Sequence, residues 1–177
     1  MKSSPAGQDS CCSTKPPQPP RWRRYIPLFT LITLALLAAA AKQLHYGAWA
    51  PQSAMHDFMG IFLLTFSMLK LFDLPGFAGG FQKYDLLAGR ARGYALLYPF
   101  LELSLALGYL SQWQPQTVYL ATILLMSFGA IGVFLALAKG LDIRCACMGT
   151  ALNVPLSTVA VVENVGMAAM AVGMLLI

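Results

Sequence analysis

Five long apolar runs dominate the sequence and leave little material for a water-soluble fold. They are rich in Leu, Ala, Met, Phe and Val and occupy residues 25–41, 58–74, 94–110, 116–138 and 158–177. At about 1.5 Å per residue, helices of these lengths cross most or all of the roughly 30 Å hydrocarbon layer of a membrane. Only helices or a closed barrel can span that layer, and continuous rather than alternating runs favour helices. The sequence therefore predicts an all-α transmembrane bundle of about five spans.

The composition supports the same fold class. Charged residues make up 11% of the chain and hydrophobic residues 58%, whereas soluble domains carry about 25% charged residues. The net charge of +5 would suit a nucleic-acid-binding protein, but the basic residues flank the apolar runs and form no arm or stripe. We therefore expect the lipid bilayer as a partner, and no nucleic acid.

The N-terminal segment differs from the rest of the chain. Residues 1–20 are rich in Pro, Ser and Gln and precede the basic cluster RWRR, a composition that cannot bury enough surface to fold. We predict a disordered basic tail over residues 1–24 and a transmembrane helical domain over residues 25–177. The first run ends in four alanines and could instead belong to a signal peptide, although the long basic leader favours a retained span.

The basic residues also predict the orientation of the spans. The tail and the segments 75–93 and 139–157 hold most of the Lys and Arg, and Lys70 lies near the same side, whereas the opposite connections hold only Lys42. By the positive-inside rule, we expect the N-terminus to be cytoplasmic. The segment 75–93 is either an amphipathic helix on the inner leaflet or a loop broken by its glycines.

Two glutamates lie within the apolar runs. Glu102 is central in the third run and Glu163 is near the start of the fifth. A charge at this depth costs on the order of 3 kcal/mol, so we expect both side chains to face the bundle interior. Tyr94 and Tyr98 precede Glu102 at intervals of four residues and form one polar stripe with it.

Three methionines share a helical face with Glu163: Met167, Met170 and Met174. One interpretation is a path of carboxylate and thioether groups leading away from a cysteine-containing loop. The other is that methionine fills irregular helix interfaces, and that each glutamate bonds to a neighbouring Tyr, Ser or Asn.

His45, His56 and Asp57 fall in or near the first outer connection. Two histidines and a carboxylate are a possible metal-ligand set, but the spacing of these histidines is not diagnostic. We expect polar residues that face the membrane interface instead.

The stretch RCACMGT contains Cys145 and Cys147, separated by a single alanine. A small disulfide ring formed by this pair would be strained and prone to exchange, and the neighbouring Arg144 favours the thiolate. The same two thiolates, with the Met148 thioether, also suit a soft ion such as Cu(I). Two inert cysteines are the remaining alternative. Another pair, Cys11 and Cys12, lies in the tail and could bind metal, form a disulfide or carry a lipid.

Two stretches resemble one known family. FSMLKLFDLPGFAGGFQKYDLLAGRARGYALLYPFLELSLALGYL and DIRCACMGTALNVPLSTVAVVENVGMAAMAVGML are similar to the MauE/DoxX-like redox-associated membrane proteins, which include the methylamine-utilisation protein MauE. The similarity covers about residues 56–177. Its most specific parts are the YP-x-x-EL segment around Glu102 and the CAC-x-GT loop followed by Glu163.

The resemblance implies a DoxX-like four-helix bundle with an additional N-terminal span, placed in the bacterial inner membrane. It also implies that Cys145 and Cys147 form the redox or metal-binding pair, and that Glu102 and Glu163 are intramembrane acids. A thioredoxin-like or other redox protein is the implied partner, and relatives with this loop suggest metal-handling proteins as well.

Three functions remain open. In the first, Cys145 and Cys147 cycle between dithiol and disulfide, without an organic cofactor, as a thiol–disulfide oxidoreductase or its accessory. In the second, the same cysteines and Met148 bind Cu(I) or another soft metal ion, in a transport-associated role. In the third, the bundle stabilises a partner and performs no chemistry. The charge bias places the cysteines inside, whereas disulfide formation in exported proteins requires thiols that are accessible from outside.

Overall fold

The computed structural model describes residues 25–46, 50–82, 92–138 and 156–177. These ranges are helical and contain no strand. The elements in chain order are α1 (Ile26–Tyr46), α2 (Pro51–Phe72), α3 (Leu74–Phe81), α4 (Arg92–Leu110), α5 (Pro115–Ala138) and α6 (Leu156–Leu176). The predicted N-terminal tail lies outside the described residues.

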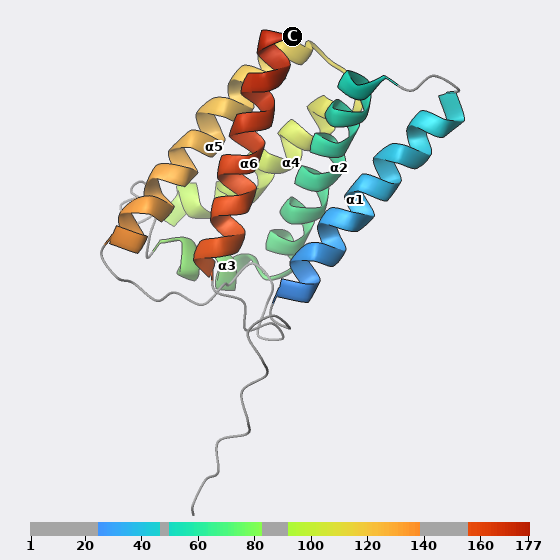
Figure 1. The fold of residues 1–177 in the computed structure, drawn as a ribbon. Helices are drawn as coiled ribbons and strands as arrows, with labels where there is room; N and C mark the ends of the chain where they lie inside the picture. The colour runs from blue at the N-terminus through green and yellow to red at the C-terminus, as the bar shows by residue number, and fades with distance from the viewer. Residues whose placement is uncertain (1–24, 47–49, 83–91, 139–155) are drawn as a thin grey trace, which may run out of the picture.

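The predicted all-α transmembrane bundle is confirmed. Five of the described helices, α1, α2, α4, α5 and α6, are long and apolar enough to cross a membrane. Successive long helices run in opposite directions, and α3 lies at the end of the bundle away from the C-terminus (Figure 1). We call this end the α3 end, because the starts of α1, α4 and α6 and the ends of α2 and α5 also lie there.

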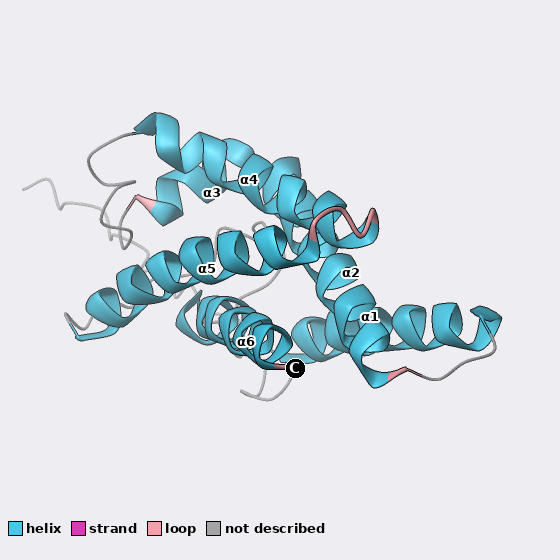
Figure 2. Ribbon diagram, turned by 90° about the horizontal axis from the view of Figure 1, so that it is seen from above, coloured by secondary structure: helices cyan, strands magenta, loops and turns pink. Residues whose placement is uncertain are grey.

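Four of the long helices form the bundle proper. The most extensive contacts join α2 to α4 and α5 to α6, while α1 packs mainly on α2. Viewed along the bundle, α1 lies outside the group formed by α2, α4, α5 and α6 (Figure 2). This arrangement agrees with the expected four-helix bundle and additional N-terminal span.

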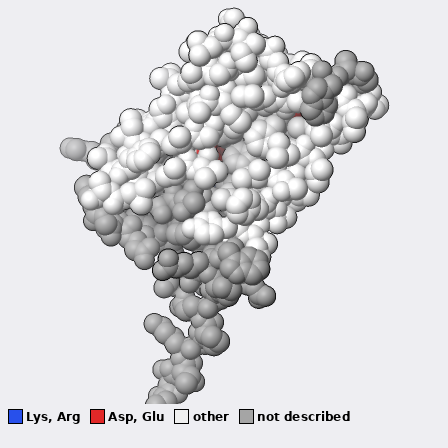
Figure 3. Space-filling view, in the orientation of Figure 1, with Lys and Arg blue, Asp and Glu red and all other residues white. Residues whose placement is uncertain are grey.

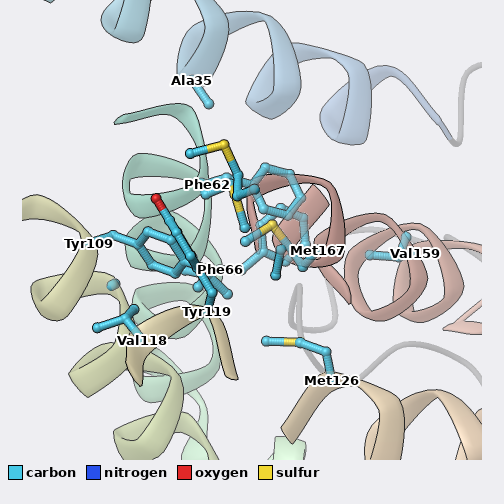
Figure 4. Packing of buried hydrophobic residues seen from close by; sticks show 14 of the residues in the cluster. Ala35, Phe62, Phe66, Tyr109, Val118, Tyr119, Met126, Val159 and Met167 are labelled. Carbon is cyan, nitrogen blue, oxygen red and sulfur yellow. The ribbon is translucent and has the colours of Figure 1, made fainter. Parts of the chain in front are cut away.

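The core between these helices is built from aromatic, aliphatic and methionine side chains. Phe62 and Phe66 of α2 meet Met126 of α5 and Met167 of α6 in this core (Figure 4). Met174 is also buried in this core, and the partly buried Met170 packs against the core. The methionine face of α6 is therefore part of the packed interior, as the packing interpretation expects.

The outer surface of the bundle is suited to lipid. Large apolar side chains such as Phe29, Leu124 and Phe134 are more than half exposed. In Figure 3 the described face is almost entirely free of charged atoms, with small acidic spots visible in hollows. A surface of this kind is stable against hydrocarbon and not against water.

The second span starts earlier than its apolar run indicates. The run begins at Phe58, but α2 begins at Pro51, in the first-turn position that proline favours. The additional residues include His56 and Asp57, which are buried with partners inside the bundle. Because these polar groups are satisfied by neighbouring helices, they interrupt the hydropathy without ending the helix.

The short helix α3 forms the first part of the segment 75–93, whose residues 83–91 lie outside the described residues, and it packs against the bundle. It begins after Asp73, whose carboxylate accepts a hydrogen bond from the backbone N–H of Gly76 at 3.0 Å. Phe77 and Phe81 are buried against α4, and the ring of Phe81 is tilted against that of Tyr98 with 4.6 Å between ring centroids. The glycines of α3 do not break it into a loop.

Gly60 lies where α2 and α4 approach each other closely. A Cβ added at Gly60 would lie 2.9 Å from Cβ of Tyr109, an atom held by the α4 backbone. We expect Gly60→Ala to lower the free energy of unfolding of the detergent-solubilised protein by roughly 1–3 kcal/mol, although alanine is the better helix former. Thermal unfolding followed by circular dichroism measures the effect.

The matched control is Gly166→Ala in α6, where an added Cβ meets nothing within 4 Å. This substitution should leave stability unchanged or raise it. Equal stability of Gly60→Ala and the wild type would show that α2 and α4 are not in close contact.

Candidate functional site: a charged cluster inside the bundle

Three charged side chains from three different helices meet inside the bundle. Nζ of Lys70 on α2 lies 2.6 Å from both carboxylate oxygens of Glu102 on α4. The same nitrogen lies 2.5 Å from Oε1 of Glu163 on α6. The three N–H donors of one ammonium thus face three carboxylate oxygens. We call this set the Lys70–Glu102–Glu163 cluster.

The cluster is almost completely shielded from solvent. The side chains of Lys70 and Glu163 are each 3% exposed and that of Glu102 is 0% exposed. Charges this deeply buried are tolerated only when they are paired and hydrogen-bonded. The cluster therefore ties α2, α4 and α6 together at one point of the bundle.

Aromatic rings surround the ammonium group. Nζ of Lys70 lies 5.4 Å from the ring centroid of Tyr98 and 5.7 Å from that of Phe77. Both distances fall in the range of cation–π attraction. Because Phe77 belongs to α3, the packing of this short helix helps to close the α3 end over the cluster.

A neutral polar contact adjoins the cluster. The hydroxyl of Tyr98 donates to Oδ1 of Asn164 at 3.1 Å, and Nδ2 of Asn164 donates to the carbonyl of Ala160 at 2.8 Å. A Cβ on Gly129 of α5 would lie 2.7 Å from Oδ1 of Asn164. Glycine at this position therefore leaves room for the hydrogen bond between Tyr98 and Asn164. Asn164 directly follows Glu163 in the sequence.

Sequence reasoning found two members of the cluster and missed the third. The expectation that Glu102 and Glu163 face the interior is confirmed, and Tyr98 lies on the same buried face as Glu102. The alternative in which each glutamate bonds to a neighbouring Tyr, Ser or Asn leaves out Lys70, with which both glutamates pair. The sequence places Lys70 near the basic side of the spans, whereas in the structure its side chain is buried. Two intramembrane acids require a cation, and that requirement was the available signal.

The opposite end of the bundle contains a second polar network. Nε2 of His56 lies 2.8 Å from the carbonyl oxygen of Tyr109, which can only accept, so this nitrogen carries the hydrogen. Nδ1 of His56 lies 2.7 Å from the hydroxyl of Tyr119. Tyr109 in turn donates to Thr122 at 3.0 Å. These bonds connect α2, α4 and α5 and engage both imidazole nitrogens.

Asp57 forms a separate ion pair at the same end. Its carboxylate lies 2.6 Å from Nζ of Lys42 and accepts from Nε2 of Gln43 at 3.1 Å. Asp57 is 1% exposed and Lys42 34% exposed. The two residues border a polar cavity of about 510 Å³ that also includes Ser53 and Gln112.

The histidines do not form a metal site in the described part of the chain. No group of three or more His, Cys, Asp or Glu is placed for metal binding within residues 25–46, 50–82, 92–138 and 156–177. His45 is exposed at the end of α1, whereas His56 and Asp57 are buried in different contacts. The expectation that these residues face the interface therefore fails for His56 and Asp57, because helix partners satisfy them.

The cysteine pairs and Met148 lie outside the described residues. The helix ends that flank the segment with Cys145 and Cys147, Ala138 of α5 and Leu156 of α6, both lie at the α3 end (Figure 1). The Lys70–Glu102–Glu163 cluster includes side chains near that end, since Lys70 is in the last turn of α2.

Comparison with known proteins identifies the family. Residues 25–177 match the family described as methylamine utilisation protein MauE. No match was found among curated proteins or among solved structures. The matched range contains the first span as well, which the resemblance over residues 56–177 had left out. It also contains the Lys70–Glu102–Glu163 cluster, Cys145 and Cys147. With five helices able to span a membrane, the chain is a multi-pass membrane protein and belongs to the MauE family.

Proposed function

We propose that this protein performs thiol–disulfide exchange through Cys145 and Cys147 in methylamine utilisation. The observation that carries the proposal is the family match over residues 25–177, which includes the C-x-C pair. A thioredoxin-like protein is the proposed partner. The basic residues on the N-terminal side support a cytoplasmic N-terminus in a bacterial inner membrane.

The bonds, electrons and protons of the proposed exchange balance between the cysteine pair and the partner. The thiolate of one cysteine attacks a disulfide of the thioredoxin-like partner and forms a mixed disulfide, with one partner thiolate as the leaving group. The second cysteine, as thiolate, then displaces the partner and closes the Cys145–Cys147 disulfide. Two electrons pass from the pair to the partner, and the partner's dithiol takes up the two protons that the pair loses. The reverse sequence reduces the pair.

Residue chemistry near the pair favours this reaction. Arg144 precedes Cys145, and a neighbouring cation stabilises the thiolate that acts as nucleophile. A ring closed through a single intervening residue is strained, and strained disulfides exchange readily. Both features support exchange rather than a permanent structural disulfide.

Growth on methylamine tests the proposal. In a methylamine-using bacterium deleted for its own copy, the wild-type gene should restore growth and the Cys145→Ser/Cys147→Ser variant should not. Membrane abundance of each variant is measured in parallel, because serine at these positions should not unfold the bundle. Cys11→Ser/Cys12→Ser is the matched control and should restore growth. Full growth with Cys145→Ser/Cys147→Ser would refute the proposal.

A further inference from the structure

The charges of the Lys70–Glu102–Glu163 cluster do not balance. With each group in its ordinary ionic form at neutral pH, one ammonium faces two carboxylates, which leaves a net charge of −1 inside the bundle. Among the described side chains, Lys70 is the cation that pairs with either glutamate. Lys42, the other lysine in the described ranges, pairs with Asp57 on α2.

The geometry brings the two carboxyl groups close together. Oε1 of Glu102 and Oε1 of Glu163 lie 2.6 and 2.5 Å from the same nitrogen, so they can be no more than 5.1 Å apart. Two full negative charges at this separation, without water, repel strongly. One proton turns the repulsion into a hydrogen bond and leaves the cluster neutral.

Among the described residues, the surroundings of the cluster supply no second cation that pairs with either glutamate. The rings of Phe77 from α3 and Tyr98 from α4 lie close to Nζ of Lys70, and their faces attract cations and not anions. From α6, Asn164 is engaged with Tyr98 and with Ala160. Nζ of Lys70 lies between the two carboxylates.

From these observations we infer that the Lys70–Glu102–Glu163 cluster is an intramembrane proton-binding site that holds one exchangeable proton at neutral pH. Its resting form is one ammonium, one carboxylate and one carboxylic acid, with the proton shared by Glu102 and Glu163. Binding converts a carboxylate to a carboxyl group and involves no other reactant. The site does not depend on the proposed thiol chemistry, because the cluster takes up its proton whether or not the cysteines exchange electrons.

The composition allows an unusually direct test on the wild-type chain. The sequence contains two glutamates, and both belong to the cluster. Glutamate labelled with ¹³C at the side-chain carboxyl therefore reports on the cluster alone, without any substitution. Infrared spectra of the full-length protein in detergent at pH 7 distinguish the C=O stretch of a carboxylic acid from the bands of a carboxylate.

We expect one isotope-shifted carboxylic acid and one isotope-shifted carboxylate, and the acid band should move in D₂O because its proton exchanges. Two carboxylates would overturn the inference, as would two carboxylic acids. An acid band that does not move in D₂O would refute an exchangeable proton.

Substitutions extend the same test. Glu102→Gln and Glu163→Gln should each lose the acid band, because the remaining glutamate then forms a neutral pair with Lys70. Lys70→Met should about double the acid band. Asp57→Asn at the other end of the bundle should leave the band unchanged. If a variant fails to fold, as judged by circular dichroism, the labelled wild-type spectra still decide the question. A retained acid band in folded Glu102→Gln and Glu163→Gln would contradict the shared proton.

Discussion

Lys70→Ala is expected to lower the stability of the described bundle strongly. The substitution removes the partner of both Glu102 and Glu163 and leaves two buried carboxyl groups facing a cavity. Removing one member of a buried ion pair typically costs about 3–5 kcal/mol. The free energy of unfolding of the purified protein in detergent, measured by thermal or denaturant unfolding, should fall by about that amount.

The other described ion pair provides the matched control. Lys42→Ala also removes a lysine from a carboxylate, but Lys42 is 34% exposed and Asp57 still accepts from Gln43. Water can enter the adjoining polar cavity of about 510 Å³, so the loss should stay within about 1 kcal/mol.

Replacing all three cluster residues distinguishes the stability lost through unpaired charge from the stability lost through an unfilled cavity. In Lys70→Met/Glu102→Met/Glu163→Met, apolar side chains of similar length fill the same space without unpaired charge. Such replacements are often neutral or stabilising, so we expect stability to return to at least the wild-type value. If Lys70→Ala were as stable as the wild type, the cluster would not be what joins α2, α4 and α6.

The spans were predictable because hydropathy and length alone determine which segments can cross a bilayer. The last three predicted spans lie within two residues of their helices, whereas the first ends five residues before α1 does and the second differs most at its start. The difference arises at His56 and Asp57, where a single sequence shows two polar residues but not the helices that satisfy them. The partners of His56, Tyr109 and Tyr119, lie more than fifty residues away in the chain.

Two members of the cluster were predictable from the sequence and the third, Lys70, was not, for a related reason. An acidic residue within an apolar run is conspicuous, so Glu102 and Glu163 could be recognised as interior groups. A lysine at the end of a run is ambiguous, because lysine also occurs commonly at the interface and orients the chain. The choice depends on which face of α2 Lys70 occupies relative to α4 and α6, and only the assembled bundle determines that.

For the methionines of α6, the sequence predicted their position but not their role. Their spacing placed Met167 and Met174 on one face, which the structure confirms, but spacing could not separate a ligand path from packing. Contact with Phe62 and Phe66 in the core makes packing their role in the described bundle. The roles of Cys145, Cys147 and Met148 stay predictions, because these residues lie outside the described ranges.

Substituting Cys145 or Cys147 is expected to have the largest effect on redox behaviour. The wild type should show a complete two-electron thiol–disulfide couple, and the substituted protein none. If the pair exchanges disulfides, both thiols should disappear together as the solution becomes more oxidising, since one disulfide consumes both. Either single serine variant removes the couple entirely, because the remaining thiol has no partner within the loop. In Cys147→Ser, the mixed disulfide with a thioredoxin-like protein should accumulate, since no second thiol resolves it.

The most direct measurement is a thiol–disulfide titration of the purified protein in a Cys11→Ser/Cys12→Ser background. The protein is equilibrated with glutathione buffers of graded oxidised-to-reduced ratio, and free thiols are counted by alkylation and mass spectrometry. The prediction is one reversible transition between two free thiols and none, which is absent from Cys145→Ser. Two thiols that stay reduced across the whole range, or that are lost independently of one another, would contradict thiol–disulfide exchange by this protein.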